Sequence, residues 1–194
     1  ERIVTIEDSA ELQLKDVVNI VRMETRDANS EGKGQITIRD LIRTALRCRP
    51  ERIIVGEVRG PEALDMLQAM NTGHEGSLST GHANSTIDSI SRLETMVLSA
   101  ARLPIEVVRQ QIASALDIVI HISRMRDKSR RVLDISELVG IYNGEVRLNS
   151  LFTFREDSSG RQLGKDGLAG KLVRTGISLS NTQKLEMAGL KWRL

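Results

Sequence analysis

Short runs of β-branched and other apolar residues recur along the chain, and each run predicts a buried strand. The runs cover residues 3–6 (IVTI), 52–55 (RIIV) and 118–122 (IVIHI), with a weaker one at 77–80 (SLST). Consecutive apolar residues fit a strand whose two faces are both covered, as in a parallel sheet packed between helices. Segments of helical periodicity lie between most of these runs, so the pattern predicts an α/β domain with a largely parallel sheet and helices on both faces.

Four helical segments separate these strands, and residues at their starts are typical helix starters. Thr37, with an acid three residues later, is a potential capping box for the segment 37–47. Pro61 and Pro104 begin the second and fourth segments, and Ser85 is placed to cap the third. The alternation of helix and strand therefore continues to about residue 122.

The pattern changes after residue 124. Two further strands, 132–139 and 145–154, flank Asn143-Gly144, a dipeptide typical of two-residue hairpin turns. The glycine-rich stretch 155–178 is predicted to be a loosely packed connection, and a short helix fits residues 181–190. We therefore expect a small antiparallel hairpin to extend the parallel sheet.

Charge separates the chain into two parts. Residues 1–154, predicted to form the α/β domain, carry 20 basic and 22 acidic side chains, whereas the tail of residues 155–194 carries 8 and 4. A net charge of +2 and an aromatic content of 2% argue against a nucleic-acid binder that stacks bases. The single cysteine, Cys48, excludes an internal disulfide, and no apolar run approaches the roughly 20 residues that span a bilayer.

Acids and a histidine follow three of the predicted strands. Glu7 and Asp8 follow the first, Glu57 follows the second after a glycine, and His82 follows the weak strand at 77–80. The carboxyl ends of parallel strands meet at one edge of a sheet, where ligands of such sheets bind. Two carboxylates and an imidazole at that edge suit metal-assisted phosphoryl transfer, although acids at strand ends are also common without any function.

Three segments resemble the boxes of the type II/type IV secretion ATPases. Residues 5–12 (TIEDSAEL) resemble the acidic Asp box, residues 53–60 (IIVGEVRG) the atypical Walker B strand, and residues 71–85 (NTGH to TGHANS) the His box. The order and spacing of the boxes match from Glu1 to about Phe154, most closely in the ATPases of Flp pili and of conjugative transfer systems. The resemblance implies a RecA-like P-loop NTPase core that binds ATP and Mg²⁺.

One departure from the family is the absence of a G-x-x-x-x-G-K-[ST] phosphate loop. The family places this loop upstream of the Asp box, and the chain opens within a predicted strand without an initiator methionine. We therefore expect a C-terminal piece of a longer ATPase, in which the first strand and the phosphate loop of the core are missing. Alone, it should bind nucleotide poorly and be inactive, because it lacks the backbone cradle and the lysine for the phosphates.

The resemblance also implies roles for individual side chains. Glu57 would serve Mg²⁺ through water, and Glu7 would be the base that activates the attacking water, although spacing leaves these two roles interchangeable. His82 would contact the γ-phosphate; the alternative is a histidine bonded to nearby backbone. Four further residues would support the nucleotide site or its loops: Asp8, Glu11, Arg59 and His74.

Arg39, Arg43 and Arg47 lie on one face of the helix predicted at 37–47, where they are either solvated or part of a surface between subunits. By resemblance, the complete protein would form a hexameric ring in the cytoplasm, bound to the inner membrane through platform proteins of a pilus or secretion machine. Two alternatives stay open: an adaptor that has lost catalysis, which the missing phosphate loop favours, and a nucleic-acid translocase on the same fold.

Overall fold

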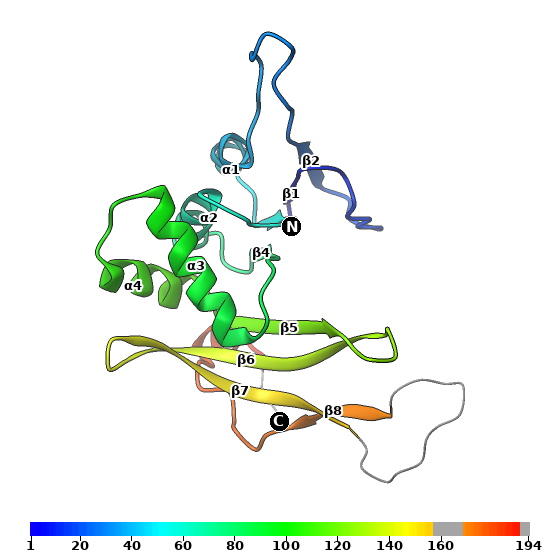
Figure 1. Ribbon diagram of the computed structural model, residues 1–194, viewed down its shortest axis with the longest axis vertical. Helices are drawn as coiled ribbons and strands as arrows, with labels where there is room; N and C mark the ends of the chain where they lie inside the picture. The colour runs from blue at the N-terminus through cyan, green and yellow to red at the C-terminus, as the bar shows by residue number, and fades with distance from the viewer. Residues whose placement is uncertain (157–168, 191–194) are drawn as a thin grey trace. The chain divides into compact units, whose positions relative to one another are not determined.

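The computed structural model describes residues 1–156 and 169–190. Contacts divide the chain into two compact units, one of Glu1–His82 with Ser91–Ala115 and one of Ala83–Ile90 with Leu116–Leu194. The division falls within helix α3 (Thr86–Ala100). Figure 1 shows the strands and helices with the labels used below.

The first unit contains a four-stranded sheet in the order β2-β1-β3-β4, and all of its neighbouring strands run parallel. The strands are β1 (Ile3–Glu7), β2 (Ile20–Glu24), β3 (Arg52–Val55) and β4 (Leu78–Ser79). The predicted parallel sheet is confirmed. Strand β2 was not predicted from the sequence. It lies at the sheet edge, and its sequence IVRME mixes apolar and charged residues.

Both faces of β1 are covered. Val4, Thr5, Ile6 and Glu7 are all buried, and successive residues of a strand point to opposite faces. Full burial of an aliphatic side chain such as Ile6 contributes about 1.5–3 kcal/mol. The continuous apolar run in the sequence therefore identified a doubly covered strand correctly.

Helices α1 (Ile38–Arg47), α2 (Glu62–Met70) and α4 (Ile105–Ala115) belong to this unit. The capping box at the start of α1 is present, since the Thr37 hydroxyl accepts the N–H of Asp40 and the Asp40 carboxylate accepts the N–H of Thr37. Helix α2 is buried along most of its length, from Ala63 to Met70. Of the helices within the described ranges, none is long and apolar enough to cross a membrane.

The second unit contains an antiparallel sheet in the order β5-β6-β7-β8. Its strands are β5 (Ile118–Arg124), β6 (Arg130–Tyr142), β7 (Glu145–Glu156) and β8 (Gly170–Arg174), and a short helix α5 (Gln183–Met187) follows. The turn between β6 and β7 is made by Asn143 and Gly144, whose φ angles of 50° and 81° fit the predicted hairpin turn.

Two features of this sheet differ from the sequence-based picture. Strand β5 was predicted as a buried strand of the parallel sheet, but it pairs with β6 through a hairpin, and its alternate isoleucines are exposed. Strand β8 lies in the stretch 155–178, which was predicted as a loose connection, and pairs with β7. The rest of that stretch up to residue 168 lies largely outside the described residues, and the boundary proposed at residue 154 stays a prediction.

Candidate functional site

The loops that follow β1, β3 and β4 lie at the same edge of the parallel sheet, because the three strands are neighbours and run in one direction. Glu7 is the last residue of β1, Glu57 follows β3 by two residues, and His82 follows β4 by three. His82 Nε2 lies 3.0 Å from Glu57 Oε1, and Arg59 Nη1 lies 3.8 Å from Asp8 Oδ2. The structure thus places Asp8, Glu57, Arg59 and His82 together.

Glu57 is the most constrained carboxylate of this group, with 17% of its side chain exposed. Its Oε2 accepts a hydrogen bond from Arg59 Nη2. This hydrogen bond lowers the pKa of Glu57 below its ordinary value of 4.5, against the opposite effect of burial, and the charges of Arg59 and His82 add to the lowering. Glu57 is therefore an ionised carboxylate at neutral pH.

The second oxygen of Glu57 has a different environment. Oε1 is buried and, among the described residues, accepts no hydrogen bond. His82 Nε2 is close enough to pair with it electrostatically, but its orientation does not make a hydrogen bond. A buried carboxylate oxygen without a donor costs free energy, so this atom is suited to accept a proton donor from a ligand or its water.

Glu7 is buried, and its carboxylate shapes the loop that follows β1. Its Oε1 accepts the backbone N–H groups of Glu11 and Leu12, each at 3.0 Å. Gly56 lies beside it, because the Gly56 N–H donates to Ile6 O at 2.8 Å. A Cβ atom at Gly56 would lie 3.0 Å from Glu7 Cγ and 3.4 Å from Ile6 O, so the Glu7 side chain, held by two hydrogen bonds, would have to shift by a few tenths of an ångström to make room.

Replacing Gly56 by alanine is expected to destabilise the chain by about 1–3 kcal/mol, because the added methyl group overpacks the buried Glu7 side chain. Urea unfolding measures this loss. Gly81→Ala is the matched control, since a Cβ there would lie 3.5 Å from Val58 O, an ordinary contact. Equal losses in both variants would contradict the packing argument.

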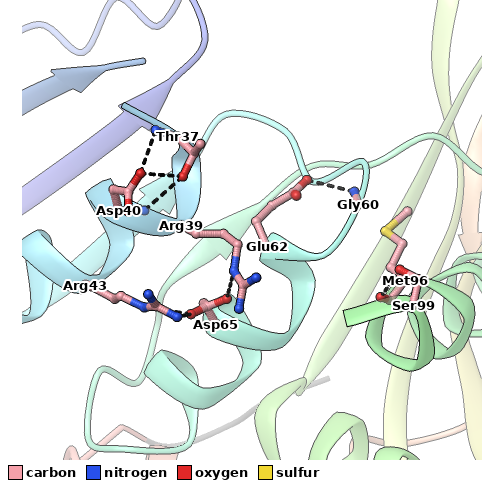
Figure 2. A network of polar contacts seen from close by, with 9 residues as sticks. All are labelled: Thr37, Arg39, Asp40, Arg43, Gly60, Glu62, Asp65, Met96 and Ser99. Carbon is pink, nitrogen blue, oxygen red and sulfur yellow. Dashed lines mark hydrogen bonds and ion pairs between the residues drawn. The ribbon is translucent and has the colours of Figure 1, made fainter. Parts of the chain in front are cut away.

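Two residues that sequence reasoning did not single out fix the loop that carries Glu57. Glu62 Oε1 accepts the N–H groups of Arg59 at 2.6 Å and of Gly60 at 2.8 Å, and Figure 2 shows the contact with Gly60. On the other side, the Thr80 hydroxyl donates to Gly56 O, and Thr80 O accepts the N–H of Val58 at 2.9 Å. The sequence did contain an indication of this role. Glu62 is an acid in the first turn of α2, shortly after Gly60, where a carboxylate can accept backbone N–H groups.

A buried carboxylate joins the two helices beside this loop. Asp65 on α2 has 8% of its side chain exposed and accepts Arg39 Nε at 2.6 Å and Arg43 Nε at 3.2 Å, both from α1 (Figure 2). The predicted arginine face is therefore not simply solvated, since two of its members neutralise Asp65. The sequence indicated this pairing only indirectly. Asp65 is a single acid within the apolar stretch of α2, and a buried carboxylate requires a charged or hydrogen-bonding partner.

An open cleft of about 310 Å³ lies beside Arg59 in the first unit. Side chains of both charges line it, among them Asp8, Arg26, Arg39 and Glu62. Arg39 is bound to Asp65, and the Arg26 guanidinium donates to Gly34 O at 2.7 Å. Much of the positive charge of the cleft is therefore already paired within the chain.

Two predicted residues, His74 and Glu11, do not place their side chains in the group formed by Asp8, Glu57, Arg59 and His82. His74 precedes β4 instead of following it, and its Nδ1 lies 3.2 Å from Ala69 O at the end of α2. Glu11 is exposed and reaches the group through its backbone N–H to Glu7 and through its charge, which helps to raise the pKa of Arg59. Within the described ranges, no three His, Cys, Asp or Glu side chains are grouped so as to hold a metal ion by themselves.

Comparisons with known proteins agree with these motifs. A protein-family model described as type II/IV secretion system protein matches residues 1–171. A solved structure of the VirB11 ATPase from the Brucella suis type IV secretion system, in complex with sulphate, matches with a TM-score of 0.62 and 32% identity. The match covers 70% of this chain and 40% of that one.

Curated relatives include proteins of conjugal transfer. One from Mycobacterium tuberculosis is 44% identical over 138 residues, which are 71% of this chain and 39% of that protein. The conjugal transfer protein TrbB of Rhizobium radiobacter is 34% identical over 158 residues, 81% of this chain and 45% of TrbB. The chain spans less than half the length of these relatives. With the family model matched over most of its length, the chain belongs to the type II/IV secretion system protein family.

Proposed function

We propose that the protein to which these residues belong hydrolyses ATP to power type II/IV secretion or pilus assembly. The observation that carries the proposal is Glu57, an ionised carboxylate with one oxygen fixed by Arg59 and one buried oxygen that lies 3.0 Å from His82 Nε2 and accepts no hydrogen bond from the described residues. Family membership and the likeness to the VirB11 ATPase, a structure with a bound tetrahedral anion, support the same activity. The 194 residues alone are expected to be inactive, because they contain no phosphate loop.

The residues fit a magnesium ion that is bound through its waters. Mg²⁺ keeps several waters and takes few direct protein ligands, which agrees with the absence of a three-carboxylate cluster in the described residues. Glu57 Oε1 would accept a hydrogen bond from such a water. When bound, Mg²⁺ would neutralise the charge that develops on the phosphate oxygens.

The contacts favour a different division of roles between the two glutamates from the one that the sequence suggested. Glu7 Oε1 already accepts two backbone N–H groups, so we assign Glu7 to positioning the Asp-box loop. Glu57 would therefore serve both the magnesium-bound water and the water beside the γ-phosphate. His82, with 86% of its side chain exposed, can turn its imidazole toward a phosphate oxygen. Asp8 and Arg59 would stabilise this arrangement by pairing with each other and with Glu57.

The same family resemblance leads us to propose a homo-oligomeric, hexameric ring. Its partners would be inner-membrane platform proteins of a secretion or pilus machine, and its location the cytoplasmic face of that membrane. Closed rings form through heterologous interfaces, in which each copy presents two different surfaces to its neighbours. Direct nucleic-acid binding is not expected from the near-neutral charge of residues 1–154.

The test is ATP hydrolysis by the protein extended upstream of Glu1 to include a phosphate loop, measured with Mg²⁺ and after its removal with EDTA. We expect turnover that disappears on chelation and returns when Mg²⁺ is added, because the phosphate charge is then neutralised again. A folded, ring-forming protein without Mg²⁺-dependent hydrolysis would favour the adaptor function instead.

A further inference from the structure

A concentration of positive charge lies at one end of the antiparallel sheet in the second unit. The β5–β6 turn and the adjoining ends of β7 and β8 lie at this end, as Figure 1 shows. The ion pair between Arg126 in the turn and Glu156 at the end of β7, at 2.9 Å, ties these segments together. Six exposed basic residues form what we call the basic end: Arg124, Arg126, Lys128, Arg130, Arg155 and Lys171.

The strand register brings like charges directly opposite one another here. Arg124 pairs with Arg130 between β5 and β6, and Arg155 pairs with Lys171 between β7 and β8. Like charges at facing positions destabilise a sheet. Apart from Arg126, no member of the basic end has a carboxylate partner among the described residues. The fold therefore concentrates charge at this end at a cost in stability, which indicates an anionic partner outside the unit.

We propose that the basic end binds the surface of an anionic lipid bilayer through its phosphate groups. The exposed Ile122 lies two residues before Arg124 on β5, so an apolar side chain adjoins the basic end, as suits contact with the headgroup boundary of a bilayer. The charges are spread over strand ends and a turn, so they can face a broad anionic surface at once. Basic residues near such a surface are attracted to it without any specific pocket.

Nucleic acid is a less suitable partner for the basic end. Among residues 1–156 and 169–190, no exposed aromatic side chain is available there for stacking, since Tyr142 lies at the opposite end of β6. A helix that could cross a membrane is also absent from the described residues.

The proposal is tested by sedimentation of the full chain with vesicles of phosphatidylcholine, alone or with about one third phosphatidylglycerol. We expect binding to the anionic vesicles only, weakened by added salt. A triple variant, Arg124→Gln, Lys128→Gln and Arg130→Gln, is expected to lose at least about tenfold in affinity. Its melting temperature should be unchanged or higher, because the facing arginine pair is removed.

The matched control removes three exposed basic side chains elsewhere, with the substitutions Lys15→Gln, Arg92→Gln and Arg102→Gln. This control should bind within about twofold of the parent, because its net charge is the same but the basic end is intact. Equal weakening in both triple variants would overturn the proposal. So would tighter binding of the parent to a duplex oligonucleotide than to the anionic vesicles, which would assign the surface to nucleic acid.

Discussion

Replacing Glu57 by glutamine is expected to lower kcat for ATP hydrolysis by the extended protein by about two to four orders of magnitude. The amide has nearly the same shape and still offers Arg59 a carbonyl oxygen, so the loop can remain in place. What is lost is the negative charge and one of two acceptor oxygens, at the position where water is oriented beside the phosphate. Steady-state hydrolysis at saturating ATP and Mg²⁺ measures this effect.

Measuring nucleotide affinity and thermal stability distinguishes a chemical role of Glu57 from a structural one. Nucleotide affinity and the melting temperature of Glu57→Gln should stay close to those of the parent, because glutamine preserves the packing of the half-buried side chain. Glu106→Gln, at an exposed position in the first turn of α4, is the control and should retain full activity. A Glu57→Gln variant with undiminished kcat would refute the assignment and move the chemistry to another carboxylate.

The sequence was sufficient to predict which side chains the parallel strands bring to one edge of the sheet. Runs such as 52–55 identify buried strands because both faces of these strands are covered, and the direction of parallel strands then places Glu57 and His82 at one edge. Strand β2 was missed because an edge strand with exposed Arg22 and Glu24 lacks the apolar run. A run of apolar residues in the sequence identifies strands that are buried on both faces. Strands that are exposed on one face lack such a run and are therefore missed.

The sequence could not supply the contacts that position the site. Arg39 and Asp65 are 26 residues apart, and only the packing of α1 against α2 brings them together. The same holds for Thr80 and Gly56, which are 24 residues apart and meet across neighbouring strand ends. Periodicity gives the face of a helix but not its partner, so Arg39 and Arg43 could be placed on a surface and not assigned to Asp65.

Glu137, on β6, is the other position where a substitution should have a large effect. The side chain is 1% exposed, and its carboxylate accepts the N–H of Ser180 at 2.8 Å and the N–H of Asn181 at 2.6 Å. These charge-assisted bonds attach the segment between β8 and α5 to the sheet. Glu137→Ala should destabilise the chain by about 3 kcal/mol, because it removes the acceptor and leaves two backbone donors unsatisfied.

Urea unfolding and amide hydrogen exchange test this prediction together. The amides of Ser180 and Asn181 should exchange faster in Glu137→Ala, since their acceptor is gone. Glu137→Gln should lose less stability, because one carbonyl oxygen can still accept a hydrogen bond. Glu145→Ala, at the exposed start of β7, should change stability by no more than about 0.5 kcal/mol. If Glu137→Ala were as mild as that control, the terminal segment would depend instead on its other attachments, Thr175 to Ser150 O and Lys184 to Asp117.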